Sequence, residues 1–270
     1  MLYLNTEGTY FGRYSEKNVM HVCMEEGPCS DVHKKKLAYI HTNNESSVMT
    51  NNTNTIHKAN KIFHILKNNF SIPEFSAHGK PFQTLIRTVL SQTTAERNTT
   101  RAFENLSHEF LIAPETLAKA NVKDIEKAIK VAGLYRNKSK AIKNISRVIL
   151  EQFDGSLDFI YTSSLEEARN KLIAIPGVGP KTADVTLLFC AKKPTIPVDT
   201  HVNRVSKRLG LAPLKANYEE IRKMLQFLYQ PEDYLAVHLL LIALGRKYCK
   251  ARNPTCKLCP VSNSCSHACI

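Results

Sequence analysis

Two groups of residues in this chain of 270 residues have the types and the spacing to do chemistry. The first is Lys181, followed eighteen residues later by Asp199. An amine of this kind can act as a nucleophile, and a carboxylate can take up a proton or stabilise a developing positive charge. The second group is a set of four cysteines near the C-terminus: Cys249, Cys256, Cys259 and Cys265.

A short turn, Pro176-Gly177-Val178-Gly179-Pro180, comes directly before Lys181 and lies between two apolar runs, 165–175 and 182–189. It is too short to link domains and predicts a tight hairpin between two helices. Glycine takes positive φ without steric cost, and proline suits the first position of a helix. The backbone N–H groups of Gly177, Val178 and Gly179 would then lie where a helix N-terminus favours an anion such as phosphate.

This hairpin would place Lys181 in the first turn of the second helix. Asp199 lies within Pro197-Val198-Asp199-Thr200-His201, just before another helical run. A lysine at one helix start and an acid at a later one are expected to face each other across a cleft. His201 is expected to be a cap or a core contact without a catalytic part.

The four C-terminal cysteines are separated by six, two and five residues, and Pro254 and Pro260 break helices between them. Thiolates at this density, in a chain where we find no secretory signal, suit a metal or iron–sulfur centre better than disulfides. Spacing alone does not separate zinc from a 4Fe–4S cluster, because both accept four cysteines.

Charge is distributed unevenly along the chain. Lys and Arg total 37 against 24 Asp and Glu, a net charge of +13. Residues 1–56 contain slightly more acids than bases, so the positive excess lies in residues 57–270 and favours a polyanionic partner such as nucleic acid. Residues 1–56 also lack sustained periodicity and contain asparagine-rich polar runs, and we expect a disordered extension there. No apolar run is long enough to span a membrane.

From Ile62 onward the apolar spacing is helical, and the predicted fold class is all-α. A helix with one buried face is indicated by Phe82, Leu85, Ile86, Val89 and Leu90. The same pattern continues over 117–132, 141–153 and 165–175, punctuated by Gly133, Gly155 and Gly177. The most apolar segment, Tyr234 to Leu244, contains His238 and predicts a buried helix.

Together, the hairpin with its lysine, the VDTH segment and the six-two-five cysteine spacing after Gly245-Arg246 resemble the endonuclease III family, which are DNA glycosylases with AP lyase activity. The resemblance covers about residues 62–265. It implies that Lys181 is the nucleophile, that Asp199 is its catalytic partner, and that the four cysteines hold a 4Fe–4S cluster. It also implies double-stranded DNA with damaged bases or abasic sites as the partner of a monomeric protein located with the DNA inside the cell.

Two further turns have counterparts in this family. Ser91-Gln92-Thr93-Thr94 carries amide and hydroxyl groups, and Gly133 to Lys138 is expected to expose Leu134 beside basic side chains. In such glycosylases a polar side chain fills the gap left by an extruded base, and an apolar wedge enters the stack. The resemblance implies these roles for Gln92 and Leu134, although many bacterial members have the glutamine one position later, where this chain has Thr93.

The resemblance also implies two helical domains with a DNA cleft between them and a C-terminal iron–sulfur loop. One domain would span residues 79–193 and end in the hairpin. The other would combine 57–78 with 194–270 and include the cluster. The basic face formed by Arg204, Lys207 and Arg208 after Asp199 suits phosphate contacts.

Three functions are compatible with these residues. The main hypothesis is a base excision repair glycosylase with AP lyase activity, which removes oxidised pyrimidines and cleaves 3′ to the abasic site by β-elimination through a lysine Schiff base. The second is a monofunctional mismatch glycosylase for thymine or adenine. The third is a non-catalytic helix-hairpin-helix DNA-binding protein, which would have no need of Asp199.

Overall fold

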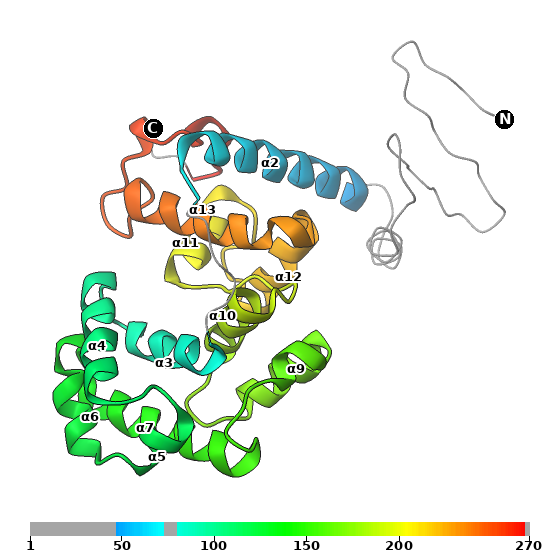
Figure 1. The fold of residues 1–270 in the computed structure, drawn as a ribbon. Coiled ribbons are helices and arrows are strands. Elements are labelled where there is room, and N and C mark those ends of the chain that lie inside the picture. Colours follow the sequence, from blue (N-terminus) through cyan, green and yellow to red (C-terminus); the bar gives the residue numbers. More distant parts are fainter. Residues whose placement is uncertain (1–46, 73–79, 268–270) are drawn as a thin grey trace, which may run out of the picture. The chain divides into compact units, whose positions relative to one another are not determined.

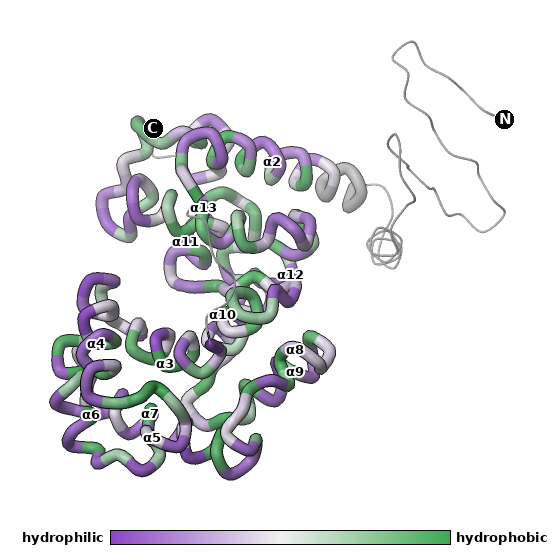
Figure 2. The backbone as a smooth tube through the Cα atoms, viewed as in Figure 1, coloured by the Kyte–Doolittle hydropathy of each residue, from purple (hydrophilic) through white to green (hydrophobic). Residues whose placement is uncertain are grey.

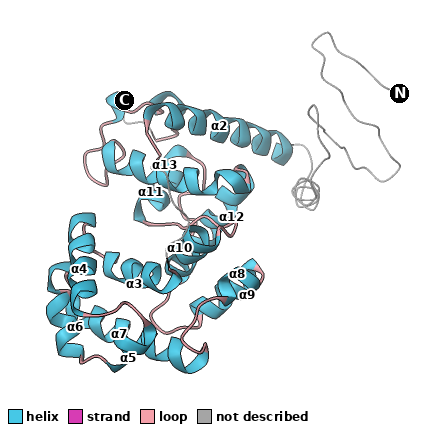
Figure 3. Cartoon of the chain, in the orientation of Figure 1, coloured by secondary structure: helices cyan, strands magenta, loops and turns pink. Residues whose placement is uncertain are grey.

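The computed structural model describes residues 47–72 and 80–267. The chain divides into two units, residues 1–54 and 55–270. The described part of the second unit is built from helices and their connecting turns and contains no strand, which confirms the all-α fold class (Figure 3). The expected disordered extension falls mostly on residues 1–46, which lie outside the described residues, whereas residues 47–56 belong to a helix.

The helices follow one another with short connections (Figure 1). In chain order they are α2 (Ser47–Asn69), α3 (Pro81–Ser91), α4 (Glu96–Glu109), α5 (Pro114–Lys119), α6 (Val122–Ala128), η1 (Lys130–Ala132), α7 (Tyr135–Gln152), α8 (Phe159–Thr162), α9 (Leu165–Ile173), α10 (Pro180–Ala191), α11 (Thr200–Leu209), α12 (Tyr218–Leu228), η2 (Pro231–Asp233), α13 (Tyr234–Lys247), η3 (Cys256–Leu258) and η4 (Ser262–Ser264). None of these described helices is long and apolar enough to cross a membrane.

A first hydrophobic core is formed by α3 to α10. The five apolar residues that predicted the first helix of this group are all buried on α3. The helix α7 contributes Ile142, Ile145 and Ile149 to the same core, each fully buried. Burying one such side chain stabilises the fold by about 1.5–3 kcal/mol relative to leaving it exposed.

A second hydrophobic core is formed by α2, α11, α12 and α13, together with parts of the C-terminal loop. Along α2, hydrophobic and hydrophilic residues alternate as expected for a helix with one buried face (Figure 2). Val237, Leu240, Leu241 and Leu244 place the most apolar stretch of α13 in this core, which confirms the prediction of a buried helix there. Leu188 of α10 also belongs to it, so α10 contributes to both cores.

The boundaries differ from the predicted ones in two places. The helical run expected over 117–132 is divided into α5, α6 and η1, because the side chain of Asn121 accepts a hydrogen bond from the Lys123 N–H and starts a new helix. The predicted helix 141–153 begins earlier, at Tyr135. The three predicted glycine breaks at 133, 155 and 177 all have positive φ, as the turns require.

A buried carboxylate connects the two cores. Asp184 of α10 is fully buried and accepts hydrogen bonds from Arg169 Nε at 2.9 Å, Thr195 Oγ1 at 3.0 Å and the Tyr218 hydroxyl at 2.7 Å. Arg169 of α9 also donates to Glu219 of α12. Burial and the Asp184 charge together raise the pKa of the Tyr218 hydroxyl. These bonds tie the helices α9 and α10 to α12 and to the segment 192–199.

Replacing this carboxylate tests its contribution to stability. We expect Asp184→Ala to lower the free energy of unfolding by roughly 3–5 kcal/mol, because Arg169 is then buried without its main partner. Urea denaturation followed by circular dichroism measures the change. The control is Glu151→Ala, which removes an exposed ion pair with Arg147 and is expected to change the same quantity by less than about 0.5 kcal/mol. Equal effects of the two variants would contradict the interpretation.

Candidate active site and DNA-contacting turns

The hairpin before Lys181 has the predicted conformation. It lies between α9 and α10, and Gly177 adopts φ +100°, which a residue with a side chain rarely does. The Val178 N–H donates to the Ile175 carbonyl at 2.9 Å and closes the turn. α10 begins at Pro180, and its first backbone bond runs from the Ala183 N–H to the Gly179 carbonyl at 3.0 Å.

The three predicted DNA-contacting residues of this hairpin differ in burial and in whether their backbone N–H groups are free to bind a ligand. Val178 is buried, and its N–H is used within the turn. The N–H groups of Gly177 and Gly179 have no acceptor among the described residues, and both residues are exposed. The hairpin can therefore donate to an anion through its two glycines, while Val178 anchors it to the core.

Lys181 and Asp199 are both half-buried at helix starts. Asp199 Oδ1 accepts a hydrogen bond from the Val202 N–H at 2.7 Å and caps α11. Within the described part of the chain, Asp199 Oδ2 accepts no hydrogen bond, the Lys181 amine makes no hydrogen bond or ion pair, and the two side chains do not pair with each other. One oxygen of the acid therefore holds the helix, and the other is available to a ligand.

His238 of α13 lies close to both side chains. The imidazole is buried, donates from Nδ1 to the Pro197 carbonyl at 2.9 Å, and makes an edge contact with Phe189. Burial lowers the pKa of His238 to about 4; the Asp199 charge opposes this shift, and the Lys181 charge adds to it. The charges of Lys181 and Asp199 thus both act on this one imidazole, and their joint part in a reaction stays a prediction. Sequence reasoning gave His238 no part in this region.

The two turns with Gln92 and Leu134 both contain unusual backbone. α3 ends at Ser91, Gln92 is exposed, and Thr93 has φ +54°. Leu134, at φ +46°, keeps 59% of its surface exposed, as the wedge prediction requires. Of the basic side chains expected beside it, Arg136 is exposed, whereas Lys138 is buried, because its amine donates to the carbonyls of Leu90 and Ala132, directly before the two turns.

The guanidinium of Arg204 is bound by groups of the protein itself. Its guanidinium donates to the Cys249 carbonyl at 2.9 Å and to the Gly245 carbonyl at 3.1 Å, and it lies against His201. Nearby Arg208 donates to the Lys250 carbonyl at 2.7 Å. The predicted basic face of α11 therefore holds the C-terminal loop, and the role of Arg204 in DNA binding stays a prediction. His201 packs against Gly245, where an added Cβ would come within 2.9 Å of Nδ1.

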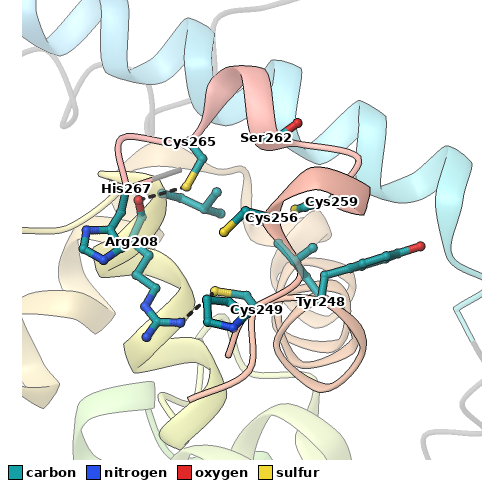
Figure 4. A pocket seen from close by; sticks show the side chains of 11 residues that line it. Arg208, Tyr248, Cys249, Cys256, Cys259, Ser262, Cys265 and His267 are labelled. Carbon is teal, nitrogen blue, oxygen red and sulfur yellow. Dashed lines mark hydrogen bonds between the residues drawn. The ribbon is translucent and has the colours of Figure 1, made fainter. Parts of the chain in front are cut away.

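The four predicted metal-binding cysteines line one pocket at the C-terminal end of the chain, together with Arg208, Tyr248 and His267 (Figure 4). Burial raises the pKa of the Cys259 thiol. An Arg208 N–H lies 3.6 Å from Cys249 Sγ, and Cys265 Sγ lies 3.3 Å from the Arg208 carbonyl. The chemistry of this donor set fits an iron–sulfur cluster, which needs four sulfur ligands around one space.

The four sulfur atoms are not all in the same covalent state in this structure. Cys249, Cys259 and Cys265 are free thiols, whereas Cys256 is disulfide-bonded. Among residues 47–72 and 80–267, no group of three or more potential ligands has the geometry to hold a metal ion. The remaining described cysteine, Cys190, is buried in the first core.

With this fold and hairpin, the chain has the features of a helix-hairpin-helix base excision repair protein. Residues 86–231 match the model of the HhH-GPD superfamily base excision DNA repair proteins. Endonuclease III of Thermotoga maritima is 40% identical over 185 residues, which cover 68% of this chain and 82% of that protein. Endonuclease III of Escherichia coli is 34% identical over 187 residues, which cover 69% and 84%.

Among solved structures, a non-covalent endonuclease III–DNA complex has a TM-score of 0.69 and 29% identity. The similarity covers 79% of this chain and 96% of that one. The chain belongs to the endonuclease III family.

The buried imidazole of His238 makes stability depend on pH. Its pKa is about 4 in the folded protein and 6.5 in an unperturbed histidine, so the unfolded chain binds a proton more readily between these values. The contribution of neutral His238 to the free energy of unfolding is fully present above about pH 6.5. It is lost as the pH falls toward 4, and about 2 kcal/mol of it is lost by pH 5. Urea unfolding at several pH values would show this slope in the wild type and a weaker slope in His238→Phe. Equal slopes would contradict the assignment.

Proposed function

We propose that this protein is a base excision repair DNA glycosylase with AP lyase activity, and that Lys181 is its nucleophile. The observation that carries the proposal is the placement of Lys181 at the start of α10, directly after the glycine hairpin, with its amine engaged by no described residue. Lys138 and Lys143, by contrast, donate to backbone carbonyls of the fold.

The reaction follows from an amine and a carboxylate beside an extruded nucleotide. The neutral amine of Lys181 attacks C1′ and the damaged base departs with the electrons of the C1′–N bond. The C1′–O4′ bond of the sugar then breaks, O4′ takes up a proton, and the ring-opened sugar is left joined to the lysine as a Schiff base. The Schiff base withdraws electrons, so a proton leaves C2′ and the 3′ phosphate is eliminated. Asp199 accepts the proton of the attacking amine and stabilises the positive charge on the sugar through its uncapped oxygen.

The DNA would lie between the two cores. We infer a domain of residues 79–193 built on the first core, and a second domain of 57–78 with 194–270 built on the other. The N–H groups of Gly177 and Gly179 would bind a backbone phosphate, with Val178 holding the turn that presents them. Exposed Leu134 would enter the base stack, and Gln92 would fill the gap left by the extruded base.

Oxidised pyrimidines in duplex DNA are the proposed substrates, and the protein would act wherever the cell keeps its DNA. A monofunctional thymine or adenine glycosylase is the alternative within the same superfamily. A thermostable thymine-DNA glycosylase shares the fold, with a TM-score of 0.63 and 20% identity. The amine of Lys181 favours the lyase, because a monofunctional glycosylase has no need of a nucleophilic lysine.

We also infer that Cys249, Cys256, Cys259 and Cys265 hold a 4Fe–4S cluster. Their shared pocket and sulfur-only donor set support it. A bound cluster would supply a charged cross-link that orders the C-terminal loop. Because Cys256 is disulfide-bonded in this structure, the proposal applies to the chain with that cysteine reduced.

Borohydride trapping tests the lysine. With duplex DNA containing thymine glycol or an abasic site, we expect wild type to form a covalent adduct and Lys181→Gln to form none, because only an amine gives a reducible Schiff base. The control is Lys171→Gln, which alters a half-buried lysine of α9 that pairs with Glu167, and it is expected to trap as wild type does. Adduct formation by Lys181→Gln at the wild-type level, or none by a folded, DNA-binding wild type, would contradict the proposal.

Iron content tests the cysteines. After reduction and anaerobic reconstitution with iron and sulfide, we expect Cys259→Ser to retain far less iron per chain than wild type, because one of four sulfur ligands is lost. Cys190→Ser is the matched control, since Cys190 lies in the first core and donates to Thr84 Oγ1. Equal iron content in the two variants would rule out Cys259 as a ligand.

A further inference from the structure

Lys138 lies in the first turn of α7 with only 4% of its surface exposed. Its ammonium donates to the Leu90 carbonyl at 2.8 Å, to Thr94 Oγ1 at 2.5 Å and to the Ala132 carbonyl at 2.9 Å. An ammonium has three N–H donors, and all three are used. Burial lowers the pKa of Lys138, and a buried ammonium needs such acceptors to remain in place.

The three acceptors come from two separate turns. The Leu90 carbonyl is in the last turn of α3, where carbonyls lack helical partners and attract a cation. The Ala132 carbonyl closes η1, directly before Gly133 and Leu134. Thr94 belongs to the first turn, and its hydroxyl also donates to the Ala132 carbonyl. One side chain therefore binds together the turn that carries Gln92 and the turn that carries Leu134.

Both turns contain a non-glycine residue in the left-handed region. Thr93 has φ +54° and Leu134 has φ +46°. A β-branched residue such as threonine is rarely found there, and such conformations persist only where the surroundings fix them. The ammonium of Lys138 binds Thr94, which directly follows Thr93, and the carbonyl of Ala132, which lies two residues before Leu134.

We propose that Lys138 is a positioning residue that fixes the Gln92 turn and the Leu134 turn as one rigid unit, so that both side chains enter the duplex together. The inference rests on the proposed function of the two turns. Lys138 itself touches neither the reacting sugar nor the DNA in this proposal, because its amine is enclosed by protein oxygens.

The test measures base unstacking apart from binding and chemistry. The probe is a duplex with 2-aminopurine, a fluorescent adenine analogue, opposite a stable tetrahydrofuran abasic site. We expect Lys138→Met to bind this duplex with near wild-type affinity, since the hairpin at Gly177 and Gly179 is intact. We expect its rate of fluorescence increase at saturating protein to fall roughly 10- to 100-fold, the cost of displacing positioned groups by about 1 Å.

Two further variants keep the test decisive. Thr94→Val removes the shared hydroxyl and leaves the Lys138 ammonium bound to its two carbonyl acceptors, so we expect the same change in smaller degree. Lys140→Met loses the same charge from an exposed position on the same helix and is expected to behave as wild type. Circular dichroism establishes that each variant is folded at the assay temperature.

If Lys138 served only to stabilise the fold, the folded variants would unstack the base at the wild-type rate. Wild-type rates in folded Lys138→Met and Thr94→Val would therefore overturn the inference, and if Lys138→Met does not fold, a wild-type rate in Thr94→Val does so alone. Failure of the proposed function is recognised separately, because the wild type would then give no borohydride adduct. Loss of unstacking in both variants with trapping intact in the wild type is the expected result.

Discussion

Asp184 carries its carboxylate into the interior between α10 and α12, and donors from three other segments surround it there. Removing a charge from water is costly, so this position is stable only while Arg169, Thr195 and Tyr218 stay in place. The Tyr218 hydroxyl also accepts from the N–H of Val198, the residue before Asp199, at 3.4 Å. The helix that begins with Lys181 and the segment that ends at Asp199 are thus fixed to one buried charge.

Lys138 and Lys181 are the same type of residue, but their hydrogen-bond partners suit them to different roles, one structural and one reactive. Lys138 is buried and donates all three of its hydrogens to protein oxygens. Lys181 is half-buried and has no partner among the described residues, although it too lies in the first turn of a helix. An ammonium with satisfied donors cannot lose a proton and attack without breaking its bonds, whereas an unpaired amine can.

The hairpin was predictable because its information is local: a proline and two glycines between apolar runs define the turn wherever the rest of the chain goes. The α3 face was predictable for the same reason. The burial of Lys138 was not, because its acceptors include Leu90, 48 residues away, and the local segment Gly133 to Lys138 has the composition of an exposed turn. The Asp184 network likewise joins residues from four segments, and no single window contains it.

The basic residues of α11 connect the C-terminal loop to the site. Arg204 and Arg208 donate to carbonyls of the loop and of the end of α13, while Asp199 caps the same helix at its start. Asp199 therefore caps the first turn of α11, and Arg204 and Arg208 join the middle and the last turn of the same helix to the end of α13 and to the loop. The loop that carries the four cysteines and the carboxylate of Asp199 are thus held by opposite ends of one ten-residue helix.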